Sequence, residues 1–142
     1  RAVAGMKDSS GDLANTRRML DLFAVRGFDV FVGSERFLLE NLRGGGVGCI
    51  TATGNVNAAA IDRLFRGWDG PGAERLQDEV NAIRGAVEKV PVIPALKALL
   101  AHHAGDPGWG TLRPPLVALA PAQRETLLAA LARLGFEMPG LG

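Results

Sequence analysis

Short apolar segments alternate with amphipathic helical segments three times in the first half of the chain. Strands are expected over residues 2–6, 28–33 and 47–53, and a segment with apolar residues at helical spacing follows each of them. This alternation is typical of βαβ units with a parallel sheet. After residue 70 the pattern is only helical. Its stripes include Leu96, Leu99, Leu100 and His103 behind Pro94, and Leu127, Leu128, Leu131 and Leu134 behind Pro121. We therefore expect three parallel βα units over residues 1–70 and a helical region over residues 71–142.

Residues that start and stop helices stand at the boundaries of this pattern. Asp12, Ser34 and Asn57 precede the three helical segments, and their short polar side chains suit the N-cap. Gly27 follows the first helix and "RGGG" (residues 43–46) follows the second, as expected of helix C-caps. The third helix is expected to bury a stripe of four apolar side chains, which are Ile61, Leu64, Phe65 and Trp68.

Three short strands leave a parallel sheet incomplete. Such a sheet is normally covered on both faces, and the first strand, Ala2 to Met6, is apolar enough to be buried on both. Three strands also leave two unpaired edges. The chain starts at Arg1 rather than at methionine and opens directly on a strand. We therefore expect a piece of a longer protein, in which further strands or another chain complete the sheet.

Charge and cysteine content exclude several classes of partner. The formal net charge is +1 with basic and acidic residues interspersed, so no basic surface for nucleic acid or an anionic membrane is expected. The most apolar segment, "VPVIPALKALLA", is much shorter than the roughly 20 residues of a membrane span, and no secretion signal is visible. The single cysteine, Cys49, permits no internal disulfide. These features predict a cytoplasmic protein without nucleic-acid or membrane partners.

Three other features that resemble binding sites have simpler explanations. "RGGGVG" (residues 43–48) lies after a helix and before a strand, which is the reverse of the order in a phosphate-binding loop. His102 and His103 are adjacent, so on a helix they point about 100° apart and cannot share a metal ion. Cys49 lies in an apolar run and is expected to be a small buried side chain. We expect a tight turn, a helix end and a core residue.

Lys7 stands where the first strand meets the polar turn "DSSGD". In one interpretation it reaches solvent or pairs with Asp8 or Asp12. In the other it is a nucleophile. An amine attacks a ketone only when neutral, and at an ordinary pKa near 10.4 only about one lysine in a few thousand is neutral at pH 7. Desolvation at the end of a buried strand lowers the pKa of a lysine and makes it suited to Schiff-base chemistry.

Five stretches of the sequence resemble, in order and spacing, the C-terminal half of a known family. They are "GMKDSSGD", "VFVGSERFLL", "GGGVGCITATGNV", "IPALKALLAH" and "LRPPLVALAPAQRETLLAAL". This succession is similar to that of the dihydrodipicolinate synthase and N-acetylneuraminate lyase family of class I aldolases. Its members are (β/α)8 TIM barrels with an appended helical region, usually homotetramers. The resemblance implies an α/β fold, the C-terminal portion of such a barrel, with the sixth to eighth strands followed by the appended helices.

The resemblance also implies roles for three residues. Lys7 matches the lysine that forms a Schiff base with pyruvate or a related 2-oxo acid, and Gly33 matches the glycine that lines the pocket after the seventh strand. Ile50 matches the eighth-strand residue whose backbone carbonyl faces that lysine. Barrel active sites lie at the carboxyl ends of the strands, where Lys7, Gly33 and residues 51–55 would converge. The implied chemistry is covalent catalysis, with no metal and no other cofactor.

Two features of the family are missing from this sequence. The chain contains no tyrosine, so the proton-relaying tyrosine has no counterpart, and the Gly-Thr-Thr-Gly-Glu stretch that holds the substrate carboxylate is absent. Both belong to the family's N-terminal half, so we expect these 142 residues alone to be inactive. We expect a dihydrodipicolinate synthase-like lyase. Sugar-acid aldolases of the 2-keto-3-deoxygluconate or 4-hydroxy-2-oxoglutarate type, or a non-catalytic α/β interaction module, are the alternatives.

Overall fold

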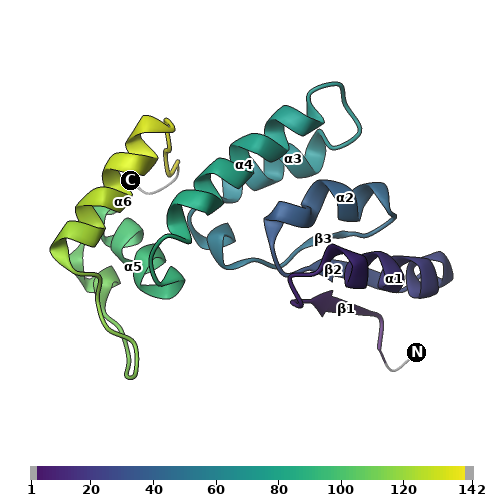
Figure 1. The fold of residues 1–142 in the computed structure, drawn as a ribbon, viewed down its shortest axis with the longest axis horizontal. Helices are drawn as coiled ribbons and strands as arrows, with labels where there is room; N and C mark the ends of the chain where they lie inside the picture. The colour runs from purple at the N-terminus through teal and green to yellow at the C-terminus, as the bar shows by residue number, and fades with distance from the viewer. Residues whose placement is uncertain (1–2, 140–142) are drawn as a thin grey trace. The chain divides into compact units, whose positions relative to one another are not determined.

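The order of strands and helices follows the predicted alternation (Figure 1). A computed structural model describes residues 3–139. The elements are β1 (Gly5–Asp8), α1 (Leu13–Phe23), β2 (Asp29–Val32), α2 (Leu38–Arg43), β3 (Gly48–Cys49), α3 (Ala58–Arg66), α4 (Ala73–Val87), α5 (Val92–His103) and α6 (Pro121–Arg133). Four short 3-10 turns are η1 (Ala24–Arg26), η2 (Glu35–Phe37), η3 (Ala52–Asn55) and η4 (Pro107–Gly110). The expected fold, three βα units followed by helices, is confirmed.

The three strands form one parallel sheet in the order β1-β2-β3. Lys7 is the register partner of Phe31, and Phe31 is in turn the partner of Gly48. Asp8 pairs with Val32, which pairs with Cys49. Register partners in neighbouring strands point to the same face of a sheet, so these two rows lie on opposite faces. The carboxyl ends of all three strands meet at one edge.

Two strand boundaries differ from the prediction. The first strand is Gly5–Asp8 instead of residues 2–6, so Lys7 lies inside the strand and not after it; Ala2 lies outside the described residues. The third strand is only Gly48–Cys49 instead of residues 47–53, because the chain turns into η3 from Ala52. The backbone N–H groups of Val47 and Ile50 still donate to β2, at Val30 and Val32, so pairing continues one residue beyond each end of β3.

Among residues 3–139 the first strand is covered on one face only, whereas its sequence predicts burial on both faces of a complete sheet. Asp8, Val30 and Val32 point to one face and are almost completely buried, and Asn41 of α2 donates to the carbonyl of Val30 there. Lys7 points to the other face and is exposed. We call the face that carries Lys7, Phe31 and Gly48 the open face of the sheet. Only one face of β1 is covered by the described residues, which is why Lys7 is exposed while its neighbour Asp8 is buried.

The predicted caps of the first two helices are confirmed. The Asp12 side chain accepts a hydrogen bond from the N–H of Ala14 at the start of α1, and the Ser34 hydroxyl accepts one from Arg36 at the start of η2. Gly27 ends η1 in the left-handed conformation, with φ 71°, which glycine adopts without steric cost. The turn at residues 43–48 connects α2 to β3, as expected of a helix end.

The chain divides into two compact units. Unit 1 consists of the residues up to Thr51 together with Ala60–Asn81. Its core is a buried apolar cluster of Leu38, Leu39, Leu42, Ile61, Leu64, Ala73 and Val80. The side chain of Trp68 packs against this cluster, but Phe65 is 44% exposed and does not belong to the predicted stripe. The cluster joins α2 and β3 to the helices that follow them.

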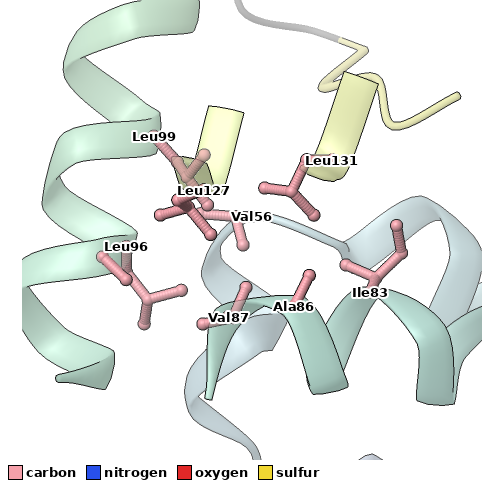
Figure 2. Close-up of a cluster of buried hydrophobic side chains, with 9 residues drawn as sticks. Val56, Ile83, Ala86, Val87, Leu96, Leu99, Leu127 and Leu131 are labelled. Atoms are coloured by element: carbon pink, nitrogen blue, oxygen red, sulfur yellow. The ribbon is translucent and has the colours of Figure 1, made fainter. Parts of the chain in front are cut away.

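Unit 2 consists of Ala52–Ala59 and the residues from Ala82 onward. Figure 2 shows its core, in which apolar side chains from the end of α4, from α5 and from α6 surround Val56. The buried members are Val56, Ile83, Ala86, Val87, Ala95, Leu96, Leu99, Leu127 and Leu131. The leucine stripes of α5 and α6 therefore form the predicted core, except that Leu134, just after α6, is 46% exposed and does not belong to it. Among residues 3–139, no helix has the length and apolar character needed to cross a bilayer.

Candidate active site at the strand ends

Lys7 lies on the open face of the sheet, one residue before the carboxyl end of β1. Its side chain is exposed, so the described residues do not supply the desolvation that is expected at the end of a buried strand. Asp8 and Asp12, the two predicted ion-pair partners, instead accept hydrogen bonds from other groups. Within the part of the chain that the structure describes, Lys7 forms no ion pair. Its amine is therefore available on this face.

Asp8 holds the end of β1 in place. One oxygen of its carboxylate accepts a hydrogen bond of 2.7 Å from the Thr16 hydroxyl, and the other accepts one of 2.9 Å from the N–H of Ser10. Burial alone would raise the pKa of Asp8, but hydrogen bonds from Thr16, Ser10 and Asn15 outweigh it and lower the pKa below its ordinary value. The carboxylate is thus ionised at neutral pH and fixes the backbone directly after Lys7 to α1.

Gly33 follows β2 and touches the end of β1. Its N–H donates to the carbonyl oxygen of Asp8 at 2.6 Å. A Cβ atom at this position would lie 2.8 Å from the Ser9 hydroxyl and 2.9 Å from that same carbonyl oxygen. No side chain fits there without displacing the backbone after Lys7. The structure therefore brings Gly33 to the loop that follows Lys7.

Ile50 lies at the carboxyl end of β3. Its N–H donates to the carbonyl of Val32 at 2.9 Å, and its side chain is 50% exposed. Since side chains alternate along a strand, Ile50 points to the same face as Gly48 and therefore as Lys7. The three residues predicted to form the site thus lie at one edge of the sheet, two of them with side chains on the open face.

Glu35 is a residue at this edge that the sequence did not indicate. It is the first residue of η2 and is completely buried. Its carboxylate accepts a hydrogen bond from the Thr51 hydroxyl, and its backbone carbonyl accepts one of 2.9 Å from the side chain of Gln77. Only one sequence signal was available, an acidic residue two positions after the strand-end glycine, and that pattern is common at helix starts.

The other candidate features of the sequence carry no chemistry at this edge. Cys49 points to the helix-covered face and is half-buried instead of fully buried as predicted. Burial and the charge of Glu35 raise the pKa of its thiol to about 11, which makes it unreactive. His102 and His103 are in the last turn of α5, and burial together with the neighbouring His102 lowers the pKa of His103. The described residues contain no group of three or more side chains suited to a metal ion.

A groove of about 440 Å³ lies within unit 2, and none of the predicted site residues lines it. Its walls come from α5, the loop after it and α6, and are mostly apolar, with His102 and Arg124 as the polar side chains. It is a separate feature of the helical unit.

Comparison with known proteins agrees with the geometry of the strand ends. Residues 1–134 match the dihydrodipicolinate synthetase family. The chain belongs to this family. An uncharacterized DapA-like lyase of Chloroflexus aurantiacus is 33% identical over 134 residues, which are 92% of this chain and 43% of that protein. The 4-hydroxy-tetrahydrodipicolinate synthase of Gluconacetobacter diazotrophicus is 29% identical over 138 residues, 94% of this chain and 45% of that enzyme.

Solved structures of the dihydrodipicolinate synthetase family show the same fold. Dihydrodipicolinate synthase from Agrobacterium tumefaciens is 31% identical, with a TM-score of 0.75, over 93% of this chain and 43% of that one. YagE, a prophage protein of this family from E. coli K12 solved in complex with pyruvate, is 25% identical, with a TM-score of 0.83, over 95% of this chain and 47% of that one. The chain therefore spans less than half the length of these relatives and forms the corresponding part of a TIM barrel with its appended helices.

Proposed function

We propose that the protein is a Schiff-base-forming lyase that acts on pyruvate or a related 2-oxo acid, in the manner of dihydrodipicolinate synthase. The observation that carries the proposal is the position of Lys7 on the open face, one residue from the carboxyl end of a parallel strand, where it is exposed and forms no ion pair with any of the residues that the structure describes. Barrel enzymes have their reacting groups at that end. The pyruvate in the YagE structure supports a 2-oxo acid as the ligand class.

The chemistry follows from the amine of Lys7. In its neutral form the amine adds to the keto carbon of the substrate, and loss of water gives an imine, which is protonated to an iminium ion. The iminium group accepts the electron pair of a bond to the α-carbon, the carbon next to the iminium carbon. Either a C–C bond of the α-carbon breaks and releases an aldehyde, or a C–H bond breaks and releases a proton. Both give an enamine, whose α-carbon can attack an aldehyde or take up a proton. Hydrolysis of the final imine returns the free amine of Lys7.

Gly33 contributes to this reaction through its lack of a side chain, and Ile50 through its backbone carbonyl. At Gly33 the absence of a side chain lets the ends of β1 and β2 approach to 2.6 Å, and we propose that it also leaves room for the substrate. We propose that the carbonyl of Ile50 faces the Lys7 amine. The proton relay and the carboxylate clamp would come from parts of the whole protein that these 142 residues do not include.

The family resemblance supports three further elements of the proposal, namely a homo-oligomeric assembly, a cytoplasmic location and catalysis without a cofactor. The last of these can be tested together with the chemistry, because an imine-forming lysine needs no metal ion.

The experiment is hydrogen exchange at the methyl group of pyruvate. The full-length protein is mixed with pyruvate in deuterium oxide with excess chelator, and loss of the methyl proton signal is followed by NMR. An enamine regains deuterium at that carbon, so we expect exchange well above the buffer rate, without any aldehyde substrate. Exchange no faster than buffer, with pyruvate and with longer 2-oxo acids, would contradict the proposal.

A further inference from the structure

A fully buried carboxylate links the two loops that follow β2 and β3. Glu35 is 0% exposed and lies two residues after Gly33. The hydroxyl of Thr51, the residue directly after Ile50, donates a hydrogen bond to this carboxylate across 16 positions of the sequence. One side-chain contact thus connects the strand end at Gly33 to the strand end at Ile50.

Gln77 of α4 fixes the backbone around Glu35 through two hydrogen bonds. The side-chain amide of Gln77 donates to the carbonyl oxygen of Glu35 at 2.9 Å, and its oxygen accepts the N–H of Leu39 at 3.0 Å. Gln77 is also buried. Because buried polar groups in low dielectric interact strongly and lose much energy when unpaired, such a network restricts its members to one arrangement. The carboxylate of Glu35 therefore has a fixed position at the edge of the sheet.

The peptide group between Ile50 and Thr51 has an anchor on each side. On one side the N–H of Ile50 donates to Val32. On the other side the side chain of Thr51 donates to Glu35. These two contacts limit rotation of the peptide plane that carries the Ile50 carbonyl oxygen.

We propose that Glu35 is a positioning residue for the lysine chemistry: through Thr51 it fixes the orientation of the Ile50 carbonyl on the open face that carries Lys7. This inference rests on the proposed function. A hydrogen bond to an ionised acceptor is stronger than one between neutral groups, so a carboxylate holds the Thr51 hydroxyl more firmly than an amide. Burying a charge to join two loops is an inefficient way to gain stability, which favours a role in geometry.

The test compares Thr51→Val, which keeps the shape and removes the donor, with Thr51→Ser, which keeps the hydroxyl. The readouts are kcat and KM for pyruvate methyl exchange by the full-length protein, and the melting temperature. Small displacements of a reacting group cost up to about 100-fold in rate. We expect Thr51→Val to lower kcat by about 10- to 100-fold, with KM changed by less than about threefold. Thr51→Ser, which keeps the hydroxyl donor, should retain most of the original kcat.

Substitutions of Glu35 complete the test. Glu35→Ala should lower kcat as much as Thr51→Val does, and the double variant should lose no more than either one, since both remove the same contact. Glu35→Gln, whose amide oxygen still accepts a hydrogen bond, should fall between Glu35→Ala and the original protein. Folded Thr51→Val and Glu35→Ala proteins with kcat within about twofold of the original would overturn the inference.

Asn41→Ala is the matched control. The buried side chain of Asn41 also joins β2 to β3, by donating to the carbonyls of Val30 at 3.1 Å and Gly48 at 3.0 Å, but it does not touch Thr51. We expect a lower melting temperature and an unchanged kcat. If the original protein catalyses no exchange, the proposed function fails; if it does, and Thr51→Val loses only melting temperature, Glu35 has a purely structural role.

Discussion

The two units of the molecule bury different kinds of side chain. Among the residues that the structure describes, unit 1 buries five polar or charged side chains, which are Asp8, Thr16, Glu35, Asn41 and Gln77. Unit 2 buries Thr53 and Asn57, both shortly after β3, and every buried side chain that the structure describes from residue 82 to residue 139 is apolar. Unit 1 therefore combines an apolar core with buried directional contacts, whereas the helical part of unit 2 is held by the packing of apolar side chains alone.

This difference between the units indicates where the exact position of side chains matters for activity. Apolar packing stabilises without specifying direction, whereas satisfied buried hydrogen bonds select one arrangement of the groups that make them. The polar contacts of Asp8 and Glu35 lie at the carboxyl ends of the strands, beside Lys7 and Ile50 respectively. We therefore expect substitutions at the strand ends of unit 1 to change activity, and substitutions in the core of unit 2 to change stability.

The largest expected effect is that of Lys7→Arg. A guanidinium remains charged and cannot attack a ketone, so turnover should fall by a factor on the order of 10³ or more, while the melting temperature stays close to that of the original protein. Lys97→Arg, on α5 of unit 2, is the control and should keep full activity. A Lys7→Arg protein with more than about a tenth of the original turnover would remove Lys7 from the mechanism.

Leu99→Ala should produce the largest loss of stability without a loss of chemistry. Leu99 is 0% exposed in the core of unit 2, and deletion of a buried leucine side chain costs about 2–5 kcal/mol. We expect that change in the free energy of unfolding, measured with denaturant, and a kcat within about twofold of the original. Ile93→Ala, on the same helix and 51% exposed, should cost less than about 0.5 kcal/mol. A folded Leu99→Ala protein with strongly reduced kcat would contradict the expectation that the core of unit 2 affects stability and not activity.

Gly33→Ala should affect both properties. The added Cβ would meet the Ser9 hydroxyl at 2.8 Å and the Asp8 carbonyl oxygen at 2.9 Å, and overpacking of this kind costs about 1–3 kcal/mol. Because the atoms that must move follow Lys7 directly, turnover should fall as well. At Gly72 a Cβ would meet nothing closer than 3.9 Å, so Gly72→Ala is the control. Equal behaviour of the two variants would show that the close approach at Gly33 is not needed.

The smallest expected effect is a pH dependence due to Asp8. Its pKa is lower in the folded protein than the ordinary value of 3.8, so the stability that it contributes is complete above that value and is lost as the pH falls through the lower, folded pKa. The original protein should therefore lose more stability than Asp8→Asn when the pH falls from about 5 to about 3. Parallel losses in the two proteins, measured by thermal denaturation, would contradict the Asp8 hydrogen-bond network.

The parts of the fold that the sequence predicted depend on local signals. The helix caps are local because Asp12, Ser34 and Gly27 contact backbone groups only two or three residues away. The leucine stripes likewise follow from the helical period. The end of β3 was misplaced because a run of small and β-branched residues suits both a strand and the η3 turn. The exposure of Phe65 was missed because periodicity gives the width of a helix stripe but not what covers it.

The site was predicted only in part for a similar reason. The sequence indicates Lys7 as a candidate because it is a cation next to an apolar strand, and the family resemblance adds Gly33 and Ile50. The sequence does not indicate Glu35, because its partners Thr51 and Gln77 are 16 and 42 positions away. Contacts over such distances are set by the packing of β3 and α4, which no local pattern reports.

Borohydride trapping shows directly whether Lys7 forms the covalent intermediate with pyruvate. The full-length protein is treated with pyruvate and borohydride, digested and mapped by mass spectrometry, with Lys7→Arg treated in parallel. Residues 1–142 contain three lysines, Lys7, Lys89 and Lys97, and the mass of the modified peptide distinguishes these from one another and from lysines elsewhere in the full-length protein. We expect a reduced pyruvate adduct on Lys7 that requires both reagents and is missing from Lys7→Arg. An adduct on any other lysine with Lys7 unmodified, or no adduct at all, would contradict the role of Lys7.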